Sequence, residues 1–323
     1  MAKITGQGIR IPDDITTNHD MEKLVETSDE WITTRTGIKE RRLAAPGELT
    51  SHLAARAAEK AVADAGLRLK DIDLIITATV TPDHRLPACS CEVQSRLGLK
   101  GVPAFDLCAA CSGFIYGLEV GSALADMGRY RNILLICAET LSSITDWTDR
   151  STCVLFGDGA GAVVIQDDSH QGHKILSAYI GADGSGMKAL YIPGGGGAQP
   201  FSAETLERHD QFVKMNGQEL FKVAVRAMVT ASKKALKKAD IDSSRVNWVI
   251  PHQANMRILN STVSRLGVDK NKLFTNLEKY GNTSAASIPL ALMEARDRFN
   301  KGDIVLCPAF GGGLTWGAAV IQW

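Results

Sequence analysis

Apolar positions along the chain follow two patterns that predict different secondary structures. Short, nearly continuous apolar runs at 73–80 and 133–138 are typical of strands covered on both faces. Longer segments at 50–66 and 217–240 place apolar residues at helical spacing, with charged residues between them. This alternation predicts an α/β fold in which helices pack on the faces of the sheets.

The same order of elements occurs twice in the chain. A helix and a strand at 50–80 correspond to a helix and a strand at 217–254, and each copy closes on a glycine-rich strand, at 156–165 and at 310–321. We therefore expect two similar halves packed together, with their boundary near 167–172. Helices at the centre of such a molecule would lie between two sheets.

A thiol stands at the start of one of these central helices. Cys111 is followed by Gly113, Gly117 and Gly121, which share one face of the predicted helix. Each glycine costs about 1 kcal/mol relative to alanine, so the stripe predicts that another backbone passes very close. The helix N-terminus is expected to lower the pKa of the Cys111 thiol, as in a nucleophile. The alternative is a buried free cysteine at a helix start.

The composition excludes several classes of protein. The 323 residues carry no net charge, which argues against strong nucleic-acid binding. The first residues lack the apolar stretch of a signal peptide, and no apolar run is long enough to span a membrane. The seven scattered cysteines favour a reducing cytoplasm over a disulfide framework. Cys108 and Cys111 have the spacing of a redox or zinc pair, but no second pair accompanies them, so we expect no metal site.

Two further polar residues lie where the predicted strands end and helices begin. His252 follows the apolar run 249–251, and Asn282 stands in a G-N-T-S turn before a helix. With Cys111 they could form a cysteine-protease-like triad, but two neutral donors facing a thioester carbonyl suit an enolate better. The alternatives are a core histidine and a helix cap. The glycines at 311–313 could form a tight turn or present N–H groups to a thioester at Cys111.

Four motifs together resemble one enzyme family. The motifs are D-L-C-A-A-C-S-G-F, P-H-Q-A-N-M-R, Y-G-N-T-S-A-A-S and F-G-G-G-L-T-W-G. In this order they resemble β-ketoacyl-[acyl-carrier-protein] synthase III, the thiolase-fold enzyme that starts bacterial fatty-acid synthesis. The resemblance implies a five-layered αβαβα sandwich of two pseudo-symmetric βαβαβ-type halves. Residues 1–168 would carry the nucleophile, and residues 169–323 would carry the enolate pocket.

The resemblance also implies a role for each motif. Cys111 would attack an acyl-CoA thioester and become acylated, with the N–H groups of Cys111 and Gly312 holding the oxyanion. His252 and Asn282 would bind the malonyl-ACP carbonyl and stabilise the enolate left by decarboxylation, which then attacks the acyl group. Phe310 would lie against this site. No metal or organic cofactor is expected, because decarboxylation supplies the carbanion.

Family likeness extends to the contacts with coenzyme A. The adenine would lie between Trp31 and Arg150, and Trp31 also sits in a polar helix with arginine neighbours, which suits stacking. The alternative for Trp31 is a helix anchor that packs on the core. The remaining CoA contacts implied by the family match Thr27, Arg35, Asn255, Gly217 and Phe221.

The charge of one segment bears on the protein partner, and one departure from the family bears on the choice of acyl starter. The segment 214–272 holds twelve Lys/Arg against four Asp/Glu, which would attract an acidic acyl carrier protein. Arg257 matches the carrier-binding arginine of the family, and Arg265 lies near it; the lysines could instead be a solvated helix face. Leu86 replaces a phenylalanine that closes the acyl pocket across the dimer in the acetyl-preferring enzyme. We therefore expect a homodimer that accepts starters longer or bulkier than acetyl.

Three alternative functions remain open on the sequence alone. The first is a condensing enzyme of a specialised pathway, and the second is a hydrolase or acyltransferase that stops at the acyl-enzyme. The third is a non-catalytic binding subunit with the thiolase fold. The presence of Cys111, His252 and Asn282 argues against the last two.

Overall fold

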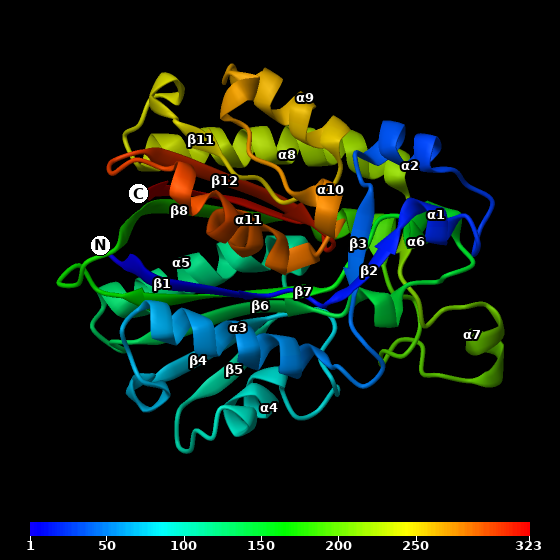
Figure 1. The fold of residues 1–323 in the computed structure, drawn as a ribbon, viewed down its shortest axis with the longest axis horizontal. Coiled ribbons are helices and arrows are strands. Elements are labelled where there is room, and N and C mark those ends of the chain that lie inside the picture. Colours follow the sequence, from blue (N-terminus) through cyan, green and yellow to red (C-terminus); the bar gives the residue numbers. More distant parts are fainter.

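The computed structural model describes residues 1–323 and shows the repeated order of elements directly (Figure 1). The first copy consists of β1 (Lys3–Arg10), α3 (Thr50–Asp64), β4 (Leu74–Ala78), α4 (Cys89–Arg96), β5 (Ala104–Leu107), α5 (Gly113–Asp126), β6 (Ile133–Glu139) and β7 (Gly159–Gln166). The second copy consists of β8 (His173–Ala182), α8 (Gly217–Lys238), β11 (Trp248–Val249), α9 (Met256–Leu266), α11 (Ser287–Ala295), β12 (Ile304–Gly311) and β13 (Thr315–Gln322).

Shorter elements lie around these two copies. They are β2 (Asp14–Thr17), α1 (Asn18–Met21), α2 (Asp29–Thr36), β3 (Glu40–Leu43), α6 (Arg150–Cys153), β9 (Leu190–Tyr191), α7 (Ala203–Glu207), β10 (Lys214–Met215) and α10 (Leu277–Tyr280). The change of copy falls between the end of β7 and the start of β8. The division of the chain into two domains at 168 and 169 stays a prediction. No helix is both long enough and apolar enough to cross a membrane.

Nine strands form one sheet in the order β11-β12-β13-β8-β1-β7-β6-β4-β5. Outward from the β8–β1 junction, the strands of the second copy follow the order β8, β13, β12, β11. The strands of the first copy follow the corresponding order β1, β7, β6, β4 on the other side. That junction is short, because only Lys3 and Ile4 pair with Lys174 and His173. The separate sheets expected from the sequence are thus linked by a narrow strip of hydrogen bonds.

The layers follow the predicted five-layered arrangement (Figure 1). Helices α8 and α9 cover one outer face, and α3 and α4 cover the other, while α5 and α11 lie between the two halves of the sheet. The inner helices are apolar over most of their surface, so they require cover on both sides. The fold is therefore the thiolase-like sandwich that the resemblance implied.

The glycine face of α5 is contacted mainly by side chains of neighbouring segments rather than by their backbone. A Cβ at Gly117 would stand 2.3 Å from Cδ1 of Leu135, and one at Gly121 would stand 2.7 Å from Cδ1 of Ile165. Gly113 faces the side chains of two alanines. The prediction of a close approach is confirmed, but the prediction of a passing backbone is wrong, because large residues of β6 and β7 fill the groove instead.

The glycine-rich segment 310–321 is not a single strand. Strand β12 ends at Gly311 and β13 begins at Thr315, so the glycines form the turn of an antiparallel hairpin. This turn brings the second half of the chain against Cys111, because a Cβ on Gly311 would lie 2.6 Å from the Cys111 backbone nitrogen. Only a residue without a side chain permits this approach.

Candidate active site

A cavity of about 1200 Å³ lies where the two halves meet. Cys111 reaches it from the first half, and His252, Asn282 and Phe310 reach it from the second. These residues are far apart in the chain, and the pseudo-symmetric fold brings their loops together. The structure thus gathers the predicted trio on one cavity.

Cys111 lies in a tight turn rather than at the first residue of a helix. A 3₁₀ turn spans Ala110–Ser112, and α5 begins at Gly113. Ala110 has a positive φ of 45°, so the backbone at the turn is strained. The Thr315 hydroxyl donates to the Ala109 carbonyl (2.8 Å) and lies 3.1 Å from the Gly312 carbonyl, which fastens the turn to the glycine hairpin.

The expectation that the Cys111 thiol has a lowered pKa is wrong. Burial raises the pKa of the thiol to about 12, opposed by a hydrogen bond from Ser284 and reinforced by the nearby Glu139 carboxyl. Only 8% of Cys111 is exposed, and loss of hydration is the largest cause of the raised pKa of the thiol. The sulfur is therefore a neutral thiol in the free site.

His252 is held from the backbone and from one ring nitrogen. Its backbone N–H donates to the Pro308 carbonyl of β12 (2.8 Å), and its ring Nδ1 lies 2.7 Å from the Ser287 hydroxyl of α11. Burial lowers the pKa of His252 to about 3. The imidazole is therefore uncharged at neutral pH, as the sequence predicted for a neutral donor.

Asn282 is fixed by its neighbours so that one end of its amide stays free. Its Oδ1 accepts from the Ser284 N–H (2.9 Å), and its own N–H donates to the Leu155 carbonyl (2.8 Å). Asn282 is not the cap of a helix, because the cap position of the 3₁₀ turn Ser284–Ala286 is Thr283 and that of α11 is Ala286. The bond to the Ser284 N–H fixes the orientation of the amide, whose NH₂ group makes no hydrogen bond within the chain at this cavity wall.

Two residues of this site were missed by the sequence reasoning. Glu139, at the end of β6, is fully buried and accepts from the hydroxyls of Thr79 (3.1 Å) and Thr81 (2.7 Å). Burial raises the pKa of Glu139 to about 7. Ser284 has a positive φ of 49°, and its hydroxyl interacts with both Glu139 and Cys111. The signal for Glu139 was a carboxyl directly after a buried strand.

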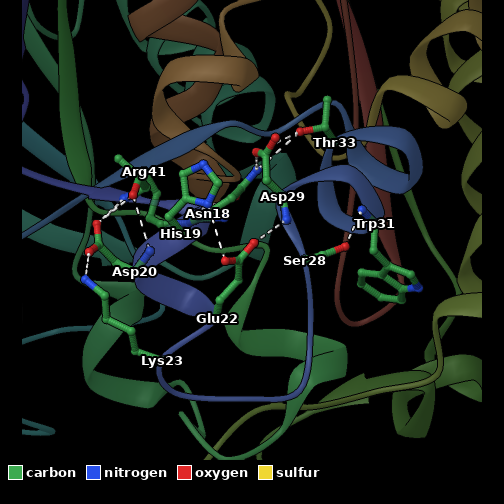
Figure 2. A network of polar contacts seen from close by, with 11 residues as sticks. Asn18, His19, Asp20, Glu22, Lys23, Ser28, Asp29, Trp31, Thr33 and Arg41 are labelled. Atoms are coloured by element: carbon green, nitrogen blue, oxygen red, sulfur yellow. Dashed lines mark hydrogen bonds and ion pairs between the residues drawn. The ribbon is translucent and has the colours of Figure 1, made fainter.

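A polar network fixes the helix that carries Trp31 (Figure 2). The Ser28 hydroxyl caps α2 by accepting from the Trp31 N–H (3.1 Å), and Asn18 donates to Asp29 (2.8 Å). The fully buried Arg41 donates to Asn18 Oδ1 (3.0 Å). Figure 2 shows the indole pointing away from this network.

Two arginines lie over the Trp31 ring. The guanidinium carbon of Arg150 is 4.8 Å from the ring centroid, and that of Arg35 is 5.3 Å from it. Of these three residues, only Arg35 lines the main cavity. Thr27 stands nearby in the chain and has a buried hydroxyl oxygen with no hydrogen-bond partner. The predicted CoA residues of the N-terminal segment therefore form a group at the edge of the cavity.

The remaining predicted contacts divide between the cavity and its surroundings. The cavity wall includes Gly217, Phe221, Asn255 and Arg257. Asn255 also connects elements, since it donates to the Arg35 carbonyl (3.0 Å) and caps α9.

Besides Thr27, Trp31 and Arg150, the predicted residues that do not line the cavity are Gly312, Arg265 and Leu86. Arg265 lines an adjoining groove of about 420 Å³ together with Lys222 and Arg226. Leu86 is 88% exposed and lies on neither wall. The structure therefore places Leu86 away from the cavity of its own chain.

Comparison with known proteins identifies relatives along the whole chain. Residues 105–184 match the family described as 3-oxoacyl-[acyl-carrier-protein (ACP)] synthase III, and residues 236–323 match its C-terminal part. A β-ketoacyl-[acyl-carrier-protein] synthase III of Caldanaerobacter subterraneus is 51% identical, covering 100% of this chain and 98% of the relative. The crystal structure of 3-oxoacyl-[acyl-carrier-protein] synthase III from Aquifex aeolicus is 47% identical with a TM-score of 0.92, covering 100% of both chains. The priming β-ketosynthase of the R1128 polyketide pathway is 31% identical with a TM-score of 0.90, covering 100% of this chain and 96% of that one.

Proposed function

The chain belongs to the 3-oxoacyl-[acyl-carrier-protein] synthase III family, and on that premise we propose that it condenses an acyl-CoA starter with malonyl-ACP. The products are 3-oxoacyl-ACP, CoA and carbon dioxide, and the reaction initiates fatty-acid biosynthesis. The observation that carries this proposal is the convergence of Cys111, His252 and Asn282 on one cavity from two halves of the chain.

In the first half-reaction, Cys111 takes the acyl group from CoA. Its sulfur attacks the thioester carbon, the thiol proton leaves, and collapse of the tetrahedral intermediate expels CoA, which gains a proton. The N–H groups of Cys111 and Gly312 are proposed to bind the oxyanion. In support, the Gly312 N–H donates no hydrogen bond within the chain, and Gly311 lies against the Cys111 nitrogen.

In the second half-reaction, His252 and Asn282 hold the thioester carbonyl of malonyl-ACP. Cleavage of the bond to the carboxylate releases carbon dioxide and leaves the electron pair in an enolate, whose oxygen these two neutral donors stabilise. The enolate carbon attacks the acyl carbon on Cys111 and expels the sulfur as a thiolate, which takes up a proton from solvent to restore the thiol. No metal or organic cofactor enters this scheme, and none is proposed.

The CoA and carrier contacts are proposed from the same geometry. An adenine between Trp31 and Arg150 requires about 7 Å between them, or two van der Waals layers, so Arg150 must move outward from its present 4.8 Å. Thr27, Arg35, Asn255, Gly217 and Phe221 would contact the rest of CoA. Arg257, with its guanidinium 5.6 Å from the Phe221 ring, and Arg265 would receive the acidic carrier protein beside the cavity.

A homodimer is proposed from the outer edge of the sheet. Strand β5 is a free edge, and its residue Phe105 is 38% exposed. With Leu86 88% exposed on a nearby loop, a second copy seated here would cover both residues and receive Leu86 near its own acyl pocket. A leucine there, beside Phe310, would admit starters longer than acetyl. The seven free thiols support a reducing, cytoplasmic location.

The function is tested by following the mass of the protein and the product. We expect incubation with acetyl-, butyryl-, isobutyryl- or octanoyl-CoA to acylate Cys111, and addition of malonyl-ACP to yield 3-oxoacyl-ACP. Cys111→Ala should abolish both steps, whereas Cys153→Ala, which removes a buried thiol outside the cavity, should preserve them. Asn282→Ala should acylate normally and fail to decarboxylate.

Each other outcome identifies a different function. Acylation without chain extension would indicate a hydrolase or acyltransferase, and no acylation would indicate a binding subunit. Extension only with an unusual donor or acceptor would favour a specialised pathway, for which the R1128 priming enzyme is a structural precedent. Strict preference for acetyl-CoA would refute the proposal for Leu86.

A further inference from the structure

The hydrogen bonds around Ser287 determine which ring nitrogen of His252 carries its proton. Ser287 is the first residue of α11 and is only 1% exposed. Its hydroxyl oxygen lies 2.7 Å from His252 Nδ1 and accepts from the Gln253 backbone N–H at 3.3 Å. These are the two hydrogen bonds that the hydroxyl makes within the chain.

Counting donors and acceptors leaves one consistent assignment. A hydroxyl has one proton to donate, and a backbone N–H can only donate, so the Gln253 contact uses a lone pair of the Ser287 oxygen. The Ser287 proton then has His252 Nδ1 as its acceptor. If Nδ1 itself carried a proton, the buried hydroxyl proton would have no partner, at a cost of about 1–3 kcal/mol.

We propose that Ser287 is a positioning residue that holds His252 in the tautomer protonated at Nε2. The imidazole then presents an N–H to the cavity, next to the free NH₂ group of Asn282. In the opposite tautomer, Nε2 would present a lone pair to the enolate oxygen, and the two would repel each other. This inference rests on the proposed function, because it explains how a neutral histidine stabilises an enolate.

One other polar group contacts the imidazole. The Ser284 carbonyl interacts with the His252 ring and attracts a proton to the nitrogen that faces it. The two tautomers are therefore distinct outcomes that a measurement can separate. Burial keeps the pKa of His252 low, so the neutral ring is the species observed at pH 7.

The direct experiment is ¹⁵N NMR of the whole protein labelled at histidine. Protonated and unprotonated ring nitrogens have widely separated ¹⁵N shifts, and His252→Gln assigns the signal among the seven histidines. We expect wild-type His252 to be protonated at Nε2, and Ser287→Ala to shift the population toward Nδ1. A wild-type spectrum with the proton on Nδ1 overturns the proposal, whatever the variants do.

Kinetics separate positioning from a structural role. Ser287→Ala should slow decarboxylation of malonyl-ACP about 10- to 100-fold, the loss typical when the outer partner of a functional histidine is removed, while acylation of Cys111 is unchanged. Ser287→Thr, which keeps the hydroxyl, should restore the rate. Ser232→Ala is the matched control, because Ser232 is also fully buried but donates to the Met228 carbonyl in α8.

The remaining outcomes are also decisive. Unchanged decarboxylation and an unchanged tautomer in Ser287→Ala would refute the role of Ser287. Wild-type protein that condenses no substrate would refute the proposed function instead, and the NMR spectrum would still decide the tautomer.

Discussion

Glu139 offers a quantitative test of how the centre of the molecule is solvated. It is a fully buried carboxyl with no ion pair, held only by hydroxyl groups and by the Val80 N–H (3.1 Å). Burial raises the pKa of Glu139 from 4.5 to about 7. Folded protein therefore holds this proton more tightly than the unfolded chain does, so stability falls as pH rises between these two values.

The size of the effect follows from the two pKa values. One pH unit corresponds to about 1.4 kcal/mol, so the step from 4.5 to about 7 corresponds to roughly 3 kcal/mol of unfolding free energy. The Glu139→Gln variant cannot ionise at this position, so its unfolding free energy does not fall with pH for this reason. Relative to wild type, the unfolding free energy of the variant should rise by about 3 kcal/mol between pH 4.5 and pH 8. Any effect of the amide that does not depend on pH adds only a constant to this difference.

Urea unfolding at fixed protein concentration measures this change. The free energies of wild type and Glu139→Gln are compared at pH 4.5, 6, 7 and 8, and only the change in their difference is interpreted. The control Glu207→Gln removes an exposed carboxyl that makes no hydrogen bond, and its difference from wild type should stay constant. A constant difference for Glu139→Gln would show that the buried carboxyl titrates as it does in the unfolded chain, and would refute the reasoning.

Three further results are expected. Alkylation of Cys111 by iodoacetamide, followed by mass spectrometry, should rise about tenfold per pH unit from pH 7 to pH 10, because burial raises the pKa of the thiol to about 12; a plateau near pH 7 would contradict this. Gly117→Val should lower the unfolding free energy by about 1–3 kcal/mol through its clash with Leu135, whereas Gly184→Ala, with no atom within 4 Å of the new Cβ, should not. Trp31→Ala should raise KM for acyl-CoA without changing kcat, and a fall in kcat alone would argue against stacking on CoA.

The sequence predicted the layers and the meeting of Cys111, His252 and Asn282 at one place because these depend on periodicity and on repeated spacing. Continuous apolar runs indicated strands buried on both faces, and the repeat placed Cys111 and Asn282 at corresponding positions of the two halves. Those features are written locally in the chain, so they can be recognised without coordinates.

What the sequence did not predict depends on atoms contributed by distant segments. Burial raises the pKa of the Cys111 thiol because the turn that holds Ser284 and the glycine hairpin lie against it, and no local pattern around the cysteine predicts that cover. The groove at Gly117 is filled by a leucine of β6, which the spacing of glycines cannot distinguish from a crossing backbone. The sequence analysis did not identify Glu139, because its partners Thr79 and Thr81 lie about 60 residues earlier in the chain.

The narrow β1–β8 junction has a consequence for how this molecule can change. Two residue pairs join the halves edge to edge, so the alignment of the thiol with the imidazole and carboxamide also depends on the inner helices, of which α5 packs on β8 and β13 and α11 packs on β1 and β7 of the opposite half. A substitution on the facing surfaces of those helices would displace one set of reacting groups against the other as a rigid unit. Reactivity in this molecule could thus be tuned by residues that never touch a substrate.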